Sequence, residues 1–190
     1  MSRPFHAPVE VPILESERLK LRGHGLDDFI HSAAMWADPE VTRYIGGKPL
    51  SEEESWARLL RYVGHWSLLG FGYWVVEEKT TGNFIGEVGF ADDYKRDLPA
   101  LKGLPEVGWV FSSQVRGKGY ATEAVRVAIA WGDTRFPSAR TACIINPDNL
   151  ASIRVAEKCG YRQSQLTTYK SRPTVMFVRD PRPPSPNPRP

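Results

Sequence analysis

Cysteine and histidine are scarce in this sequence, and a long apolar run is absent. The 190 residues include 2 cysteines and 4 histidines. Cys143 and Cys159 form no Cys-x-x-Cys pair, and no histidine lies at a ligand spacing from either, so we expect two reduced core thiols and no metal site. No apolar stretch approaches the roughly 18 residues that cross a bilayer, so no membrane-spanning helix is expected.

The N-terminal sequence argues against a signal peptide for export, and the net charge argues against a nucleic-acid-binding surface. Met1–Pro12 contains Arg3, His6 and Glu10, and therefore lacks the apolar segment of a signal peptide. The formal net charge is only +3, which is too small for a nucleic-acid-binding surface. We expect a cytoplasmic protein without a membrane partner or a direct nucleic-acid partner.

Length and composition suit one globular domain. The chain is 41% hydrophobic and 25% charged, and its length allows a sizeable core. Residues 181–190 alternate proline with polar residues and cannot enter a helix or a sheet interior. We therefore expect a flexible extension over residues 1–12, a domain over 13–179 and a disordered proline-rich tail over 180–190.

Between these ends the apolar pattern alternates strands with helices. Helices are expected where a capping residue precedes an apolar stripe, at about 28–37, 52–66, 118–133 and 149–159. Strands are expected at about 15–23, 70–76, 83–91, 107–111, 139–145, 161–169 and 173–179. The fold class is α+β, with a mixed, mostly antiparallel sheet of about seven strands, a parallel or splayed central pair, and about four flanking helices.

A glycine turn lies where the strand at 107–111 gives way to the helix at 118–133. It reads Gln114-Val115-Arg116-Gly117-Lys118-Gly119, and such a turn before a helix start is an anion site. A Walker loop is excluded because Gly119 and Tyr120 follow Lys118, and Thr122 stands where a dinucleotide fingerprint needs its third glycine. The acyl-CoA pyrophosphate pattern Gln/Arg-x-x-Gly-x-Gly/Ala fits at every specified position.

A second segment narrows this interpretation. Residues 146–161 read Asn-Pro-Asp-Asn-Leu-Ala-Ser-Ile-Arg-Val-Ala-Glu-Lys-Cys-Gly-Tyr and follow a strand at the expected distance. Together with 14–22, 83–90 and 106–109, these segments resemble the GCN5-related N-acetyltransferase (GNAT) superfamily, over roughly residues 13–179. The chain looks most like the RimJ/RimL-type branch of ribosomal-protein N-terminal acetyltransferases.

The resemblance implies an acetyl-CoA site without a metal. The expected pyrophosphate contacts are the main-chain N–H groups of the turn and the Thr122 hydroxyl, that is Arg116, Gly117, Lys118, Gly119, Tyr120, Ala121 and Thr122. The strand edge formed by Trp109, Val110 and Phe111 would pair with the pantetheine arm, and an N–H near Val110 or Phe111 would polarise the thioester carbonyl. Asn149 would reach the pantetheine and Ser152 the sulfur, although both also fit an ordinary helix cap.

The sequence indicates the catalytic base and the catalytic acid less clearly than the acetyl-CoA site. An α-amino group, with a pKa of about 7.7–8.0, needs less help to lose its proton than a lysine amine at about 10.4. Glu106 is the preferred base, Glu87 or a water relay are the alternatives, and a purely structural Glu106 remains open. Many superfamily members place an acidic tyrosine where this chain has Ala156, so Ser152 is the remaining candidate for contact with the leaving thiolate.

The acceptor is left open as a protein N-terminus or a small amine such as an antibiotic or polyamine. We expect the early helices and the loop 92–104 to select it, through one or two aromatics of a mostly buried set (Trp36, Tyr44, Trp56, Trp66, Phe71, Trp74) and through Asp92, Asp93 and Asp97. A catalytically silent acyl-CoA-binding module is the alternative function, and a monomer or homodimer is expected.

Overall fold

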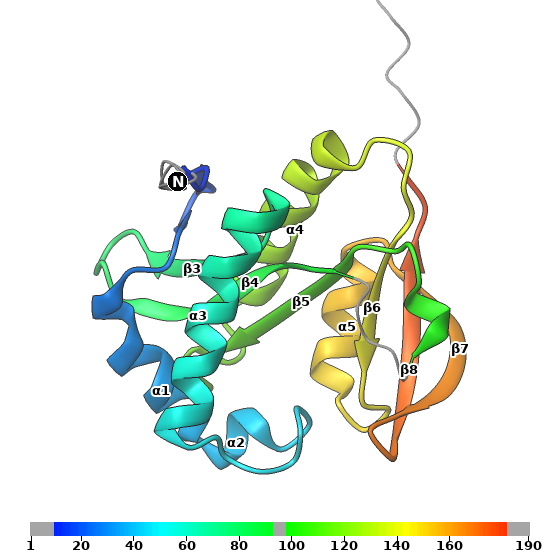
Figure 1. Cartoon of the computed structure of the whole chain (residues 1–190), viewed down its shortest axis with the longest axis horizontal. Helices are drawn as coiled ribbons and strands as arrows, with labels where there is room; N and C mark the ends of the chain where they lie inside the picture. Colours follow the sequence, from blue (N-terminus) through cyan, green and yellow to red (C-terminus); the bar gives the residue numbers. More distant parts are fainter. Residues whose placement is uncertain (1–9, 93–97, 182–190) are drawn as a thin grey trace, which may run out of the picture.

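The computed structural model describes residues 10–92 and 98–181 (Figure 1). The strands are β1 (Leu14–Glu15), β2 (Leu19–Arg22), β3 (Tyr73–Glu78), β4 (Phe84–Ala91), β5 (Glu106–Phe111), β6 (Thr141–Ile145), β7 (Arg162–Tyr169) and β8 (Arg172–Arg179). The helices are α1 (Phe29–Ala37), α2 (Pro39–Thr42), α3 (Glu52–Leu69), α4 (Tyr120–Arg135) and α5 (Leu150–Lys158). Short 3-10 turns lie at Leu26–Asp28, Pro99–Leu101 and Ser113–Val115.

The strands form one sheet in the order β1-β2-β3-β4-β5-β6-β8-β7. Neighbours pair antiparallel except β5 and β6, which run parallel and share a single register pair, Glu106 with Ala142. The α+β class and the splayed central pair are therefore confirmed. The sheet has eight described strands, since Ser16 donates to the Leu19 carbonyl and turns the expected strand 15–23 into β1 and β2.

The expected helices are present with ends shifted by up to three residues, and one additional short helix, α2, is found. Asp38 ends α1 as predicted, but its side chain also accepts a hydrogen bond from the Glu40 N–H at 2.8 Å and begins the additional helix α2. The predicted cap at Ser51 is present as a capping box with Glu54. α4 begins at Tyr120, two residues later than expected, because Gly119 is left-handed with φ 82°.

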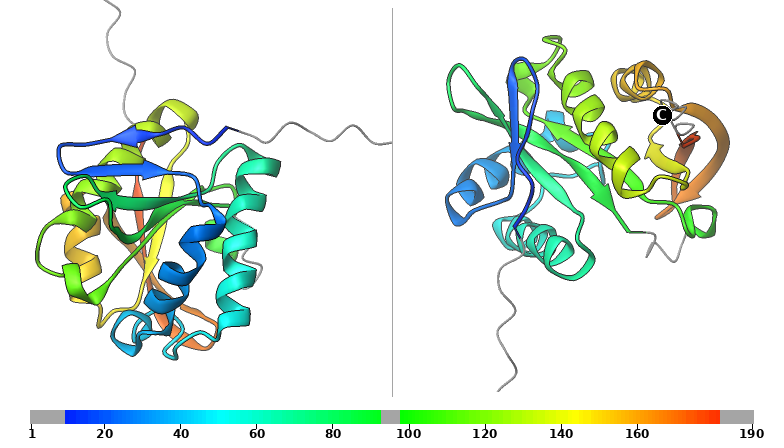
Figure 2. Two further views of the ribbon diagram at one scale, coloured as in Figure 1. Left: turned by 90° about the vertical axis from the view of Figure 1, so that its left-hand side faces the viewer. Right: turned by 90° about the horizontal axis from the view of Figure 1, so that it is seen from above.

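Two helical layers cover opposite faces of the sheet (Figure 2). On β4 and β5, Glu87 and Val110 face α1, where Glu87 bonds to Ser32 and Val110 packs with Trp36. Alternate residues such as Val88 face the other side and pack with α4 in the main core. Because side chains alternate along a strand, Glu106 and Gly108 share the α1 face with Val110.

The described ends of the chain pack on the domain. Trp74 donates a hydrogen bond from Nε1 to the Pro12 carbonyl at 2.9 Å, and Val11 packs against the core, so the domain includes part of the expected extension 1–12. Residues 1–9 and 182–190, which carry the rest of that extension and most of the expected tail, lie outside the described residues. In the described part of the chain, no helix is both long and apolar enough to cross a membrane.

Candidate active site

The glycine turn presents a row of main-chain donors at the start of α4. Gly117 and Gly119 have φ of 78° and 82°, a conformation that favours glycine. Within the described residues, the N–H groups of 117–122 meet no protein acceptor, and the first bond of the helix runs from the Glu123 N–H to the Gly119 carbonyl at 3.2 Å. The Arg116 N–H donates to Ser113 instead, so the free donors begin at Gly117 rather than at Arg116.

Arg18, just before β2, and Glu78, at the end of β3, contact this turn. Arg18 ion-pairs with Glu123 at 2.6 Å and donates from Nη1 to the Lys118 carbonyl at 3.0 Å. The Tyr120 hydroxyl is hydrogen-bonded to Glu78. The Arg116 guanidinium is paired with Glu40 at 3.0 Å. These contacts with protein side chains stabilise the conformation of the turn.

The splay leaves one edge of β5 open next to this turn. The Ser112 N–H donates to Ile85 on β4 at 3.0 Å, and main-chain polar groups alternate sides along a strand. Val110 therefore faces β4, whereas the N–H groups of Trp109 and Phe111 face the gap toward β6. The open edge has the donor pattern that an added extended chain would need, and Val110 is not one of its donors.

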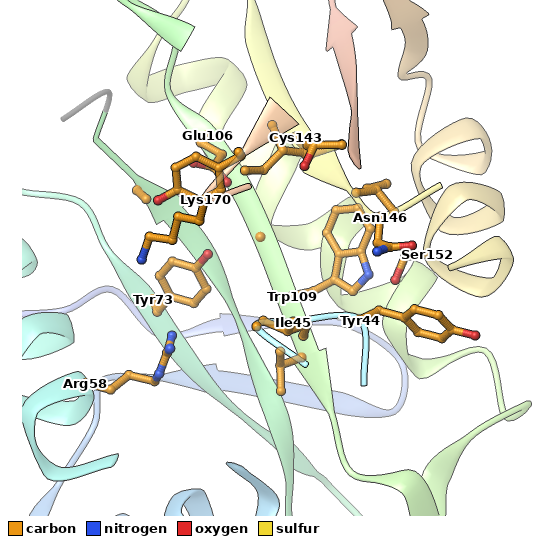
Figure 3. Close-up of a pocket in the computed structure, with 18 of the residues that line it drawn as sticks. Tyr44, Ile45, Arg58, Tyr73, Glu106, Trp109, Cys143, Asn146, Ser152 and Lys170 are labelled. Atoms are coloured by element: carbon orange, nitrogen blue, oxygen red, sulfur yellow. The ribbon is translucent and has the colours of Figure 1, made fainter. Parts of the chain in front are cut away.

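A cavity of about 1080 Å³ lies between the diverging strands β5 and β6 (Figure 3). It brings together both predicted catalytic residues, Glu106 and Ser152, with Asn149 and the β5 residues Trp109 and Val110. The glycine turn and Phe111 do not line it. β5 lines the cavity through Trp109 and Val110 and leads along the chain to the glycine turn.

The two candidate bases are placed very differently. Glu87 is fully buried beneath α1, where Ser32 Oγ donates to it at 2.6 Å and Trp36 Nε1 at 3.0 Å. Burial raises the pKa of Glu87, but these hydrogen bonds and the nearby His24 outweigh burial and lower the pKa below its ordinary value. Glu106 instead borders the cavity with 6% of its surface exposed. The arrangement favours Glu106 as the group that an acceptor can reach.

Asn149 and Ser152 form the cap that was the alternative interpretation. Asn149 Oδ1 accepts a hydrogen bond from the Ser152 N–H at 3.2 Å, while the Ser152 side chain borders the cavity. Capping uses the oxygen of the Asn149 amide and leaves its nitrogen available. Tyr161, which follows α5, is buried and its hydroxyl pairs with Thr141 at 2.7 Å, so it lies in the core. The capping contact of Asn149 is therefore compatible with a ligand contact through its amide nitrogen.

The remaining expected residues divide between cavity and core. Cys143 and Cys159 are free and buried as predicted, and Cys143 also borders the cavity. Of the aromatic set, Trp36 and Tyr44 line the cavity, while Trp56 is 39% exposed. Trp66, Trp74 and Phe71 belong to the main core. Asp92 lines the cavity, and Asp93 and Asp97 lie outside the described residues. The described residues hold no group of three or more side chains suited to a metal ion.

Sequence reasoning missed Arg58 and Tyr73 on the cavity wall. Tyr73 stacks on Tyr62 at 4.6 Å between ring centroids, and the Arg58 Nη1 lies 3.5 Å from the Tyr62 hydroxyl. Burial raises the pKa of Tyr73 to about 12, so its phenol stays protonated at neutral pH. A tyrosine at a strand start and an arginine within an amphipathic helix carry no distinctive signal, which is why the sequence did not mark them.

Comparison with known proteins identifies the family of this chain. Residues 18–162 match the family model described as an acetyltransferase (GNAT) domain. The N-acetyltransferase YjdG from Bacillus subtilis is 32% identical over 78% of this chain and 89% of its own, and YkkB from the same organism is 28% identical over 87% and 94%. A chain assigned to the GnaT family from Bordetella pertussis has a TM-score of 0.77 at 26% identity, covering 88% of this chain and 99% of its own.

Solved structures with the same fold act on different acceptors. The ribosomal-protein-S5-alanine acetyltransferase from Vibrio fischeri has a TM-score of 0.71 at 20% identity, covering 92% of this chain and 100% of its own. The spermidine N-acetyltransferase from Vibrio cholerae has a TM-score of 0.69 at 17% identity, covering 87% and 97%. At these identities the likeness concerns the fold alone.

Proposed function

Because the chain belongs to the GNAT acetyltransferase family, we propose that it transfers the acetyl group of acetyl-CoA to a primary amine. The observation that carries this proposal is the row of unpaired N–H groups over 117–122, next to the open edge of β5. Acetyl-CoA supplies an activated acetyl thioester when it is bound. The protein's part is to hold the pyrophosphate, align the thioester and accept the proton of the amine.

The turn and the strand edge would bind the cosubstrate in sequence. The N–H groups of Gly117, Lys118, Gly119, Tyr120 and Ala121, with the Thr122 N–H and hydroxyl, meet the pyrophosphate at the positive end of α4. The main chain of Trp109 and Phe111 pairs with the pantetheine arm, and one of these two N–H groups polarises the thioester carbonyl. The amide nitrogen of Asn149 approaches the arm from the opposite wall.

Glu106 would accept the amine proton. The amine nitrogen attacks the thioester carbon, a C–N bond forms and the C–S bond breaks. The amine proton passes to Glu106 directly or through a water molecule, and a proton returns to the CoA sulfur. The place of Glu106 supports this role, because it borders the cavity at the vertex where β5 and β6 begin to separate.

Ser152 is the candidate for contact with the leaving sulfur. Ala156 stands where many members of the superfamily have tyrosine. Its methyl side chain has no proton to donate, and it is fully buried in the core. Ser152 borders the cavity near the start of α5 and would donate a hydrogen bond to the thiolate or relay a water proton. Unchanged turnover of Ser152→Ala at saturating acetyl-CoA would remove Ser152 from the mechanism.

The RimJ/RimL-type pattern favours the N-terminal amine of a cytoplasmic protein as the acceptor. The α-amino group of such an acceptor is substantially neutral near pH 7.5, since its pKa is about 7.7–8.0. The test is release of the free CoA thiol from acetyl-CoA with a panel of peptides and small amines. Tight binding of acetyl-CoA without release on any amine would indicate a silent binding module instead.

A further inference from the structure

Cations gather on the wall of the cavity that the acceptor would occupy. The cationic residues that line it are Lys48, Arg58, Arg61, Lys170 and Arg172, and the acidic ones are Glu54, Asp92 and Glu106. Lys48 is paired with Glu54 at 3.1 Å. No described carboxylate lies within ion-pair distance of the other four cations. Among the described residues, cations therefore outnumber carboxylates on this wall of the cavity.

Arg58 is the inward member of this cluster. Its guanidinium lies over the Trp36 ring, 3.8 Å from the centroid, and its Nε is buried without a hydrogen-bond partner among the described residues. Glu87, the nearest buried carboxylate on this face, is already engaged by Ser32 and Trp36. A buried guanidinium donor without an acceptor is unfavourable, and an anionic ligand would satisfy it.

Aromatic rings connect Arg58 with the proposed base. The Tyr73 hydroxyl lies directly against Gly108, two residues from Glu106 on the same face of β5. Tyr73 stacks on Tyr62, whose hydroxyl contacts Arg58. Two steps separate Glu106 from the Arg58 guanidinium. The first is two residues along β5, at a rise of about 3.3 Å per residue, and the second is the stacked ring pair of Tyr73 and Tyr62. The Glu106 carboxylate and the Arg58 guanidinium are therefore on the order of 10 Å apart. Figure 3 shows Arg58 and Lys170 directed to the side of the cavity that holds Tyr73.

The mouth of the cavity carries the rest of the cluster. Arg172 reaches from β8 to Gly47, beyond α2, where its guanidinium fills the space that a Cβ would need. Arg61 is exposed on α3, one turn after Arg58, and Lys170 follows β7. Positive potential at the mouth attracts an anionic acceptor and repels a polyamine, which would carry several positive charges into the same space.

We propose that the acceptor is a primary amine that also carries a carboxylate, with the amine at Glu106 and the carboxylate bound by Arg58. This inference rests on the proposed function and specifies its substrate class. An arginine fork can bind a carboxylate through two hydrogen bonds, and Arg61, Lys170 and Arg172 strengthen the field around it. A small ω-amino acid with several methylene groups between its amine and its carboxylate, and the N-terminus of an acidic peptide, share this chemistry.

The experiment measures CoA thiol release with matched acceptors. The small pair is 6-aminohexanoate and hexylamine, the peptide pair carries Asp-Glu or Lys-Lys after the same N-terminal residue, and spermidine represents polyamines. We expect kcat/KM to be at least about tenfold higher for the carboxylate member of one pair or both. The pair with the larger ratio shows whether the acceptor is a small molecule or a peptide.

Variants test whether Arg58 causes the preference for acceptors that carry a carboxylate. Arg58→Gln should lower kcat/KM about 10- to 100-fold for the carboxylate acceptor and leave hexylamine nearly unchanged, and Arg58→Lys should recover part of the loss. The exposed Arg61→Gln and Arg172→Gln should each lower the same ratio by a smaller factor, and they serve if Arg58→Gln does not fold. Arg162→Gln, exposed on β7 away from the cavity, is the matched control.

The two proposals fail in different ways. Equal or faster turnover of hexylamine or spermidine by the wild-type protein would overturn the carboxylate acceptor and leave the acetyltransferase proposal intact. The same holds if Arg58→Gln and Arg61→Gln affect the members of a pair equally. No thiol release on any acceptor would overturn both.

Discussion

Glu106 on β5 pairs with Ala142 on β6, and this is the only register pair that the two strands share. The pairing is supported by the Ala142 N–H, which donates to the Pro105 carbonyl at 3.0 Å. Beyond it the strands diverge and the cavity opens between them. A carboxylate at the vertex of a splay borders the cavity and stays mostly shielded from solvent, with 6% of Glu106 exposed. This relationship is the basis for proposing Glu106 as the base.

Replacing Glu106 should reduce turnover more than binding. Glu106→Gln keeps the size of the side chain but cannot accept the amine proton, so kcat should fall about 10²- to 10⁴-fold with little change in the KM for acetyl-CoA. Thiol-release kinetics with the best acceptor would measure this, and circular dichroism would check the fold. A kcat within about twofold of wild type would assign the proton to solvent.

Gly119 can be tested against a matched glycine outside the site. Gly119 and Gly82 have φ of 82° and 72°, and neither meets a close contact that a Cβ would disturb. An alanine in this conformation costs about 1–2 kcal/mol, so both alanine variants should lose similar stability in urea titrations. Only Gly119→Ala should raise the KM for acetyl-CoA, because only Gly119 positions the free N–H groups. Equal KM values for the two variants would contradict the anion site.

Asn149 has a capping role and a proposed ligand role that substitutions can separate. Asn149→Ala removes both and should cost about 1 kcal/mol of folding stability. Asn149→Ser keeps a capping oxygen but lacks the amide nitrogen, so it should retain most of the stability and still raise the KM for acetyl-CoA. Thermal denaturation and steady-state kinetics on the two variants measure these effects independently. A wild-type KM in Asn149→Ser would limit Asn149 to capping.

Glu87 should contribute to stability in a pH-dependent manner. Because its folded pKa is lowered, its stabilisation is present above the unfolded pKa of about 4.3 and is lost as pH falls through the folded pKa. Glu87→Gln should lose roughly 2–3 kcal/mol at neutral pH, since Ser32 and Trp36 no longer donate to a carboxylate. Its stability should then decline less steeply than wild type as pH falls below about 4.5, which urea titrations at several pH values would measure. Parallel acid profiles for the two proteins would show that other carboxylates control this range.

Local signals explain why much of the site was predictable. The glycines at 117 and 119, the cap at Asn149 and the capping box at Ser51 and Glu54 each depend on neighbouring residues, and the structure has these features at those positions. The first strand was less well predicted, because a serine turn within 15–23 is not distinguishable from a continuous strand by alternation alone.

Contacts between distant segments determined the rest. The sequence favoured Glu106 over Glu87 as the base but could not exclude Glu87. The structure shows Glu87 engaged by Ser32 and Trp36 from α1 and absent from the cavity lining. The Arg116 guanidinium pairs with Glu40 from α2, a contact that the sequence of the glycine turn does not indicate. Arg58 reaches the cavity because α3 packs beside β3, a placement that no pattern within α3 specifies.

The sequence by itself determined the family, the α+β sheet and the turn that would hold the cosubstrate, because glycine conformation, capping and alternation act over a few residues. The tertiary structure decided which acid borders the cavity, which cations remain unpaired and where the acceptor would lie. Those properties depend on burial and on ion pairs between residues such as Arg116 and Glu40, which lie far apart in the chain and meet only when the sheet and its two helical layers assemble.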